Sequence, residues 1–413
     1  MNGYTNQIEA QIASREFKKA EITIARLLRS GPPDAEIELL RILRARVRLE
    51  TARPDDALDD LHAAQQFNNQ QSRQAILELA GDIYFARFEM ASVGFADRAD
   101  TEKAKQFYNQ LIQDFPDYSN LGWIYYQIGR IALTENLVAF AKECFQKALL
   151  QPSHTRSLTA CCYERLGYVA YYEERDLTKA RDFLNRAVDT YPQTESSHWL
   201  VQVYILLSRV YKAIGDTDLA LHAAEVALNT ASAIDSGDKR LYSEALLNIG
   251  EISSEIGQRE TETINYLQAF IQTTKRPIGI DVTWSRVNEM LGNAEFNLGH
   301  YDVAATAYMA ALQLNPDHPW EVSLYHRLAR CHYQKQSYQT VIEIIQELLN
   351  RTSYDYQLIG DYRIFDLLGN AQFAIQNYSE AMIAYEVAIQ MAPVNTNYKI
   401  QIQSYLDIAR ELV

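Results

Sequence analysis

Histidine and cysteine are the residues of this chain best suited to metal or redox chemistry. His326, Cys331 and His332 lie close together, but their spacing matches no standard set of zinc ligands, so we interpret them as ordinary helix residues. Cys161 and Cys162 are adjacent, and adjacent side chains on a helix point about 100 degrees apart, which is poor geometry for a disulfide bond. The sequence therefore predicts no metal site, no cofactor and no redox centre.

Catalytic motifs are also missing from the sequence. It contains no His-Glu-x-x-His, no Gly-x-x-x-x-Gly-Lys phosphate loop, no Gly-x-Ser-x-Gly elbow and no Gly-x-Gly-x-x-Gly turn. No acid, base and nucleophile can be named that would converge on a substrate. We therefore expect no catalytic residues and no enzyme.

The charge of the chain limits its classes of partner. A net charge of −14 over 413 residues opposes binding to nucleic acids and to anionic membrane surfaces, which attract basic proteins. The longest apolar runs, such as VYILL, are far shorter than the roughly 20 residues of a membrane span, and no secretory signal is recognisable at the N-terminus. We expect a protein of the reducing cytoplasm that is not inserted in a membrane.

One segment of the sequence occurs twice in similar form. The stretch GNAEFNLGHYDVAATAYMAALQLNP, residues 292–316, returns as GNAQFAIQNYSEAMIAYEVAIQMAP, residues 369–393, with eleven of 25 positions identical. The opening small residue of this stretch serves as an anchor that recurs along the chain at intervals of mostly 37 to 42 residues. The anchors are Ile8, Ala45, Gly81, Gly129, Gly167, Ser208, Gly250, Gly292, Ala329 and Gly369.

Apolar residues follow and precede the anchors at helical spacing. An alanine stands twelve residues after many anchors, as at Ala141 and Ala304, and a larger residue such as Phe145 or Tyr308 comes four residues later. Strand-like alternation is hard to find. Each unit is therefore predicted to consist of two helices, in which the small anchor allows the larger residue to pack closely against it.

The combination of Leu-Gly, a later Ala, an aromatic residue and a closing Pro resembles the tetratricopeptide repeat. The resemblance implies an all-α, right-handed solenoid of about ten helical hairpins over residues 1–395, with a C-terminal capping helix at 396–413. That helix places Ile402, Tyr405, Leu406, Ala409 and Leu412 on one face. The predicted units start near residues 1, 38, 74, 122, 160, 201, 243, 285, 322 and 362.

Two units depart from the pattern. The third carries about eleven additional residues, an insertion near 87–103, and we expect Phe88, Met90, Val93 and Phe95 to form a loop that contacts a partner or packs back on the chain. In the second unit, Arg41 and Arg44 occupy positions that are apolar elsewhere, which suggests a slip in register. These arginines belong to a basic start of +3 over residues 1–53, either a solvated face or a dock for an acidic partner.

In the family that the chain resembles, first helices line a concave groove that binds peptides or partner helices. Arginine and aromatic residues, which are enriched at recognition surfaces, occupy the positions implied to face this groove. The predicted partner-binding residues are Trp123, Tyr126, Arg130, Tyr168, Tyr171, Tyr172, Arg209, Lys212, Arg286, Asn293, His326, Arg330, Tyr333, Arg363, Asn370 and Phe373. Some of them are expected to be core or solvated residues instead, and Glu244, Glu251 and Glu255 interrupt the set with an acidic section.

The resemblance favours a non-enzymatic scaffold or adaptor in a cytoplasmic complex, which binds a peptide or helix of another protein; self-association stays open. The alternative is a regulator that responds to a small ligand or peptide, as some bacterial repeat proteins do. Some family members bind a chaperone C-terminus with a clamp of two Lys and two Asn. Here Glu289 and Asp366 stand at the lysine positions, so the sequence does not predict that activity.

Overall fold

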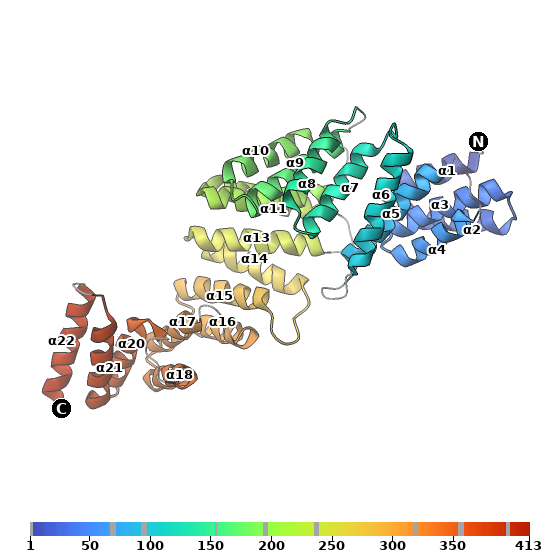
Figure 1. Ribbon diagram of the computed structural model, residues 1–413. Helices are drawn as coiled ribbons and strands as arrows, with labels where there is room; N and C mark the ends of the chain where they lie inside the picture. Colours follow the sequence, from blue (N-terminus) through green and yellow to red (C-terminus); the bar gives the residue numbers. More distant parts are fainter. Residues whose placement is uncertain are drawn as a thin grey trace. The chain divides into compact units, whose positions relative to one another are not determined.

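The computed structural model describes residues 3–66, 72–91, 97–152, 155–192, 197–234, 239–316, 321–353, 359–393 and 397–413, and these residues are largely helical (Figure 1). They form 21 helices and no strand, which confirms the predicted all-α class. The first helices of the hairpins are α1 (Gly3–Ala13), α3 (Asp34–Glu50), α5 (Arg73–Met90), α7 (Leu121–Thr134), α9 (Arg156–Tyr172), α11 (Ser197–Ile214), α13 (Arg240–Ile256), α15 (Val282–Asn297), α17 (Glu321–Gln334) and α20 (Tyr362–Ala374). Their second helices are α2 (Phe17–Arg29), α4 (Pro54–Gln65), α6 (Arg98–Asp114), α8 (Val138–Leu149), α10 (Leu177–Thr190), α12 (Thr217–Ser232), α14 (Glu260–Thr273), α16 (Tyr301–Leu314), α18 (Tyr338–Arg351) and α21 (Tyr378–Met391), and α22 (Asn397–Leu412) follows.

The chain divides into two compact units, Met1–Glu195 and Ser196–Val413. Within each unit, the two helices of a hairpin pack against each other, and the second helix packs on the first helix of the next hairpin. Several consecutive first helices also contact each other, as α11 does α13 and α17 does α20. Each unit is thus a stack of hairpins in which neighbours cover each other's apolar faces.

The glycine anchors are small because a large side chain of the second helix lies directly against them, a ring at Gly81, Gly129, Gly292 and Gly369 and a leucine at Gly167 and Gly250. A Cβ atom added at Gly129 would lie 2.6 Å from the Phe145 ring, and one added at Gly292 would lie 2.6 Å from the Tyr308 ring. Such distances are shorter than any ordinary contact, so a larger residue would push the two helices of the hairpin apart. The packing predicted from the repeat is therefore the packing observed.

The core of each hairpin is built from the residues that recur in the sequence. The alanines twelve residues after the anchors, including Ala141 and Ala304, are at most 1% exposed. Phe145 and Tyr308 are among the largest fully buried side chains. Because a fully buried side chain of this size contributes about 1.5–3 kcal/mol, these positions carry much of the stability of each hairpin.

The turn between the helices of a hairpin has a repeated backbone conformation. Seven residues after the anchor, the backbone of Asn136, Gly299 and Gln376 adopts a positive φ, at 61°, 81° and 65°. This left-handed residue ends the first helix and lets the second helix start two residues later. Glycine suits the conformation best, but only some hairpins have it, so the turn was not evident from the sequence.

The second hairpin keeps its register, contrary to the suggested slip. Ala45 is fully buried and packs with Ala57 and Leu61, as anchors do elsewhere. Two arginines of α3 are paired inside the hairpin, since Arg44 donates to Asp60 at 2.7 Å and Arg48 lies 2.9 Å from the same carboxylate. Asp60 is 2% exposed, so this carboxylate is used within the fold, whereas Arg46 of the same helix is exposed. Docking of an acidic partner on the basic start stays a prediction.

Most of the described residues of the insertion in the third hairpin are helical, where we expected a loop. Its residues lengthen α5 to 18 residues and α6 to 17 residues. Phe88 and Met90 lie in the last turn of α5, where Phe88 packs on the core and Met90 is exposed. Val93 and Phe95 lie outside the described residues.

The final helix α22 packs on α21 through Ile402, Leu406 and Ala409, which are at most 2% exposed. Tyr405 and Leu412, predicted on the same face, remain 37% and 50% exposed.

Candidate partner-binding sites

Two of the predicted groove residues, Tyr126 and His326, are largely buried from solvent. Tyr126 is 7% exposed and its ring lies against Phe145 of the same hairpin, with Trp123 edge-on at 5.5 Å. His326 is 9% exposed, and burial lowers its pKa to about 4 although Asp361 lies nearby. A partner would therefore reach little of these two side chains, and the histidine is neutral at pH 7.

Tyr168, Tyr171 and Tyr172 form a ring cluster at the end of α9. The ring of Tyr172 lies 4.6 Å from Tyr168 and 4.7 Å from Tyr171, and all three are half-buried. The guanidinium of Arg165 lies 5.7 Å from the Tyr168 ring. This cluster offers a rigid aromatic surface beside a cation.

The Arg130 pocket lies beside this cluster in the first unit. It has a volume of about 230 Å³ and is lined by Phe85, Glu89, Arg130, Leu133, Thr134, Arg165, Tyr168 and Glu173. The Arg130 guanidinium lies 4.9 Å from the Phe85 ring and also donates to the carboxylate of Glu89 on α5. The positive charge of Arg130 is thus already paired.

Three cations of the first helices in the second unit, Lys212, Arg286 and Arg327, are paired in the same way, across to a neighbouring first helix. Lys212 of α11 lies 2.7 Å from Glu255 of α13, and Arg286 of α15 lies 3.4 Å from Glu251. Two acids of the section predicted in α13 are therefore paired with neighbouring helices, and the third, Glu244, lies 3.5 Å from Arg240 of its own helix. Arg363 is instead paired with Asp361 at 2.8 Å, just before its own helix.

Asn293 and Asn370 have a structural role that their placement in the groove did not predict. The Tyr308 hydroxyl donates to Oδ1 of Asn293 at 2.8 Å, and the Tyr385 hydroxyl donates to Oδ1 of Asn370 at 2.9 Å. The residue after the anchor thus satisfies the buried tyrosine of the second helix. The sequence held the signal, because Asn and Tyr recur together at the same spacing.

A third hairpin uses a carboxylate in this position. The Tyr108 hydroxyl donates to Asp82 at 2.6 Å, and burial raises the pKa of Asp82 to about 6. Asp82 follows its anchor Gly81 as Asn293 follows Gly292. In both units, a buried tyrosine therefore donates a hydrogen bond to the residue after the anchor, which is Asp82 in the first unit and Asn293 or Asn370 in the second.

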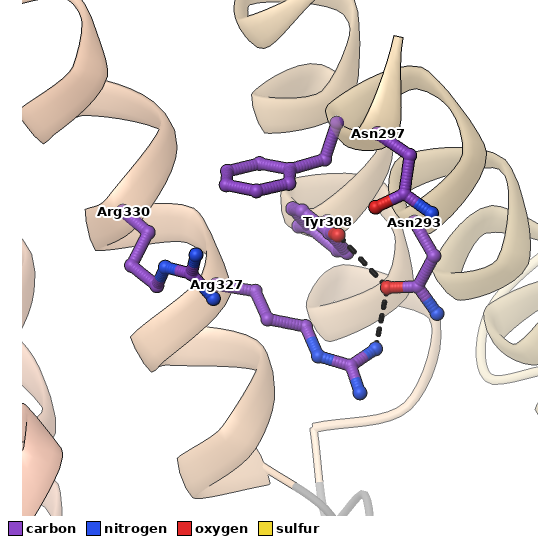
Figure 2. Close-up of a pocket in the computed structure, with 6 residues that line it drawn as sticks. Asn293, Asn297, Tyr308, Arg327 and Arg330 are labelled. Atoms are coloured by element: carbon purple, nitrogen blue, oxygen red, sulfur yellow. Dashed lines mark hydrogen bonds between the residues drawn. The ribbon is translucent and has the colours of Figure 1, made fainter. Parts of the chain in front are cut away.

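The Arg330 pocket lies between α15, α16 and α17 and is drawn in Figure 2. It has a volume of about 300 Å³ and is lined by Asn293, Phe296, Asn297, Tyr308, Arg327 and Arg330. Arg327 and Arg330 reach into it from one helix, and Arg327 bonds to Asn293 and lies 3.2 Å from Glu289 (Figure 2). Arg327 was not among the predicted residues, because it stands two positions before its anchor.

The remaining predicted residues of the second unit differ in their surroundings. Tyr333 and Phe373 each pack edge-on against the first tyrosine of the following helix, with ring centroids 5.4 Å from Tyr338 and 5.2 Å from Tyr378. Both are half-buried, as is Arg209. Their use by a partner stays a prediction.

The described residues hold no group of three or more His, Cys, Asp or Glu side chains placed to bind a metal ion. Cys144, Cys161, Cys162 and Cys331 are buried free thiols. Within the described part of the chain, no helix has the length and hydrophobicity of a membrane span.

The stacked hairpins define a helical-repeat protein whose first helices carry arginine and aromatic pockets. Models of the tetratricopeptide repeat match residues 56–118, 159–194 and 285–318. These matches, together with the stacked hairpins, support a tetratricopeptide repeat protein. No curated protein matches it in sequence.

Solved structures with the same kind of fold are distant in sequence. A signal-transduction ATPase of the STAND class with a tetratricopeptide repeat sensor, from Pyrococcus horikoshii, is 16% identical with a TM-score of 0.55, covering 91% of this chain and 55% of its own. The C-terminal part of a repeat-containing protein from Cytophaga hutchinsonii is 16% identical with a TM-score of 0.47 over 67% of this chain and 98% of its own. PilF of Pseudomonas aeruginosa is 17% identical with a TM-score of 0.44 over 59% of this chain and 95% of its own. The first of these supports the solenoid fold.

Proposed function

We propose that the chain is a non-enzymatic scaffold or adaptor that binds a peptide or helix of a partner protein along its first helices, as a subunit of a cytoplasmic complex. The repeat fold supports the general role, because tetratricopeptide repeats are generally non-enzymatic modules for protein interaction. The observation that carries the proposal is the position of both arginine pockets on the first helices, where rigid rings flank guanidinium groups.

The pairing of the other cations supports the same proposal. Ion pairs such as Lys212 to Glu255 fix the first helices relative to each other without a ligand. A face that is held in place before binding loses less conformational entropy when a partner arrives. The half-buried tyrosine cluster of α9 adds contact area at low entropic cost.

The test is affinity capture from extracts of the source cells with the full chain, followed by mass spectrometry. Arg209→Glu combined with Arg330→Glu changes two cations of the first helices and should reduce recovery of the specific partner at least about tenfold, because each reversal replaces an attraction with a repulsion. The control is Arg181→Glu, an exposed arginine on the second helix α10, which should leave recovery unchanged. Equal recovery by all folded variants, verified by circular dichroism, would contradict the proposal.

A further inference from the structure

The two arginine pockets are built from the same pair of side chains. In each, the phenylalanine four residues after one anchor lies under the arginine that directly follows the next anchor. The guanidinium to ring-centroid distance is 4.9 Å for Arg130 over Phe85 and 4.9 Å for Arg330 over Phe296. The Arg130 pocket can therefore serve as a template, that is, as a reference with which the Arg330 pocket is compared.

The template contains a carboxylate. Glu89 in the last turn of α5 accepts a hydrogen bond from Arg130 while the guanidinium stays over the ring. Glu89 is available only because the insertion lengthens α5 beyond the usual turn. The matching helix α15 ends at Asn297, so it provides no residue in that place.

Arg330 has no such partner among the described residues. It is exposed and makes no ion pair with them, although its ring contact is intact. The nearby Arg327 is occupied by Glu289 and Asn293, and Asn297 donates to Glu260 at 3.3 Å. The Arg330 pocket thus has a positioned cation and lacks the acid that completes the other pocket.

We propose that the Arg330 pocket binds the carboxylate of one Asp or Glu side chain of an extended partner segment, in the place that Glu89 takes at Arg130. The inference rests on the proposed function and specifies the chemistry of the partner. A planar guanidinium matches a carboxylate with two donors, and the aromatic ring beneath it holds it in position. Because the whole chain carries −14, a segment with one well-placed acid suits it better than a polyacidic one.

The experiment is phage display of random 12-residue peptides on the full chain, with parallel selections on Arg330→Gln and on Arg181→Gln. Wild type and Arg181→Gln should enrich peptides that share an acidic position, and Arg330→Gln should not. Arg181→Gln is the control, because it removes the same residue type from the second helix α10, outside both pockets, where Arg181 is paired with Asp182. The absence of any enriched peptide would overturn the proposed function, whereas peptides enriched without a shared acid, or equally on Arg330→Gln, would overturn only this inference.

A selected peptide then allows a direct measurement. Replacement of its acid by Gln should weaken binding about 10- to 100-fold to wild type, as expected for a hydrogen bond to a charged group, and have almost no effect on binding to Arg330→Gln. Equal losses on both proteins would overturn the inference. A phosphoserine replacement that binds tightly where Asp and Glu do not would also overturn it, because the site would then be one for phosphate.

A second variant tests whether a carboxylate supplied by the chain itself can occupy the Arg330 pocket, as Glu89 does at Arg130. Asn297→Glu places a carboxylate inside the Arg330 pocket and should weaken peptide binding about as much as Arg330→Gln, with Asn297→Gln as the neutral control. Unchanged binding by Asn297→Glu would overturn the inference.

Discussion

The α5–α6 hairpin of the first unit and the α15–α16 hairpin of the second are built from equivalent parts. Each has a glycine anchor, a buried tyrosine against it, an acceptor directly after the anchor and a phenylalanine under the next hairpin's arginine. They differ in two respects. The acceptor is Asp82 in one and Asn293 in the other, and only α5 is long enough to bring an acid, Glu89, to the arginine.

This difference shows that an arginine at the same repeat position can be paired within the chain in one hairpin and available to a partner in another. Arg130 and Arg330 have the same kind of neighbour below the guanidinium, but Glu89, 41 residues before Arg130 in the sequence, pairs with Arg130, whereas Arg330 makes no ion pair with the described residues. The function of a groove position therefore depends on the neighbouring hairpin as much as on its own sequence.

The largest expected effect tests what the two hairpins share. Gly292→Ala should destabilise the second unit by about 3 kcal/mol, because the added Cβ would lie 2.6 Å from the Tyr308 ring. Urea unfolding followed by tryptophan fluorescence measures it. The loss should largely disappear in a Tyr308→Ala background, and an equal loss in both backgrounds would show that the ring is not the obstacle.

A smaller effect should separate the two acceptors. Tyr108→Phe should cost about 2 kcal/mol, because it removes a hydrogen bond to the Asp82 carboxyl group. Tyr308→Phe should cost about 1 kcal/mol, because Asn293 is neutral and keeps its bond from Arg327. Thermal unfolding of the two variants compares them, and the reverse order would refute this ranking.

The smallest effect is a dependence on pH. Asp82→Asn gives the first unit the acceptor of the second and should stabilise it by up to about 1 kcal/mol at pH 7, because a half-buried charge is removed. The pKa of Asp82 is about 6 in the folded chain against an ordinary value of 3.8, so the folded state binds the proton more readily between these values. Wild type should therefore gain stability relative to Asp82→Asn as the pH falls from 7 to 5. Unfolding curves at both pH values test this, and a constant difference would contradict it.

The packing inside each hairpin could be predicted from the sequence because it depends on local spacing. Gly292 and Tyr308 are sixteen residues apart in the sequence, and helical periodicity places each on the apolar face of its helix, which face each other once the two helices form a hairpin. The same spacing connects Asn293 with Tyr308, but the amide was assigned to the groove because periodicity gives a face and not a hydrogen-bond partner.

Which side chains of the groove are paired or buried could not be predicted from the sequence, because this depends on contacts between hairpins. Glu89 reaches Arg130 only because α5 continues to Met90, into the insertion that we expected to be a loop. A signal was present, since Phe88 stands where other hairpins have their left-handed turn residue, and a bulky ring is unfavourable in that conformation. Tyr126 illustrates the other difficulty, because a tyrosine at the edge of the apolar face suits both the core and a binding surface.

The ion pairs between neighbouring first helices also bear on partner selection. Because Lys212 and Arg286 are paired with acids of α13 on this face, a uniformly charged sequence of either sign would meet like charges as well as opposite ones there. Selectivity between partner sequences would then come from the spacing of single charges along the bound segment. Raising the salt concentration would screen these charges, and it would reduce the selectivity before it abolished binding.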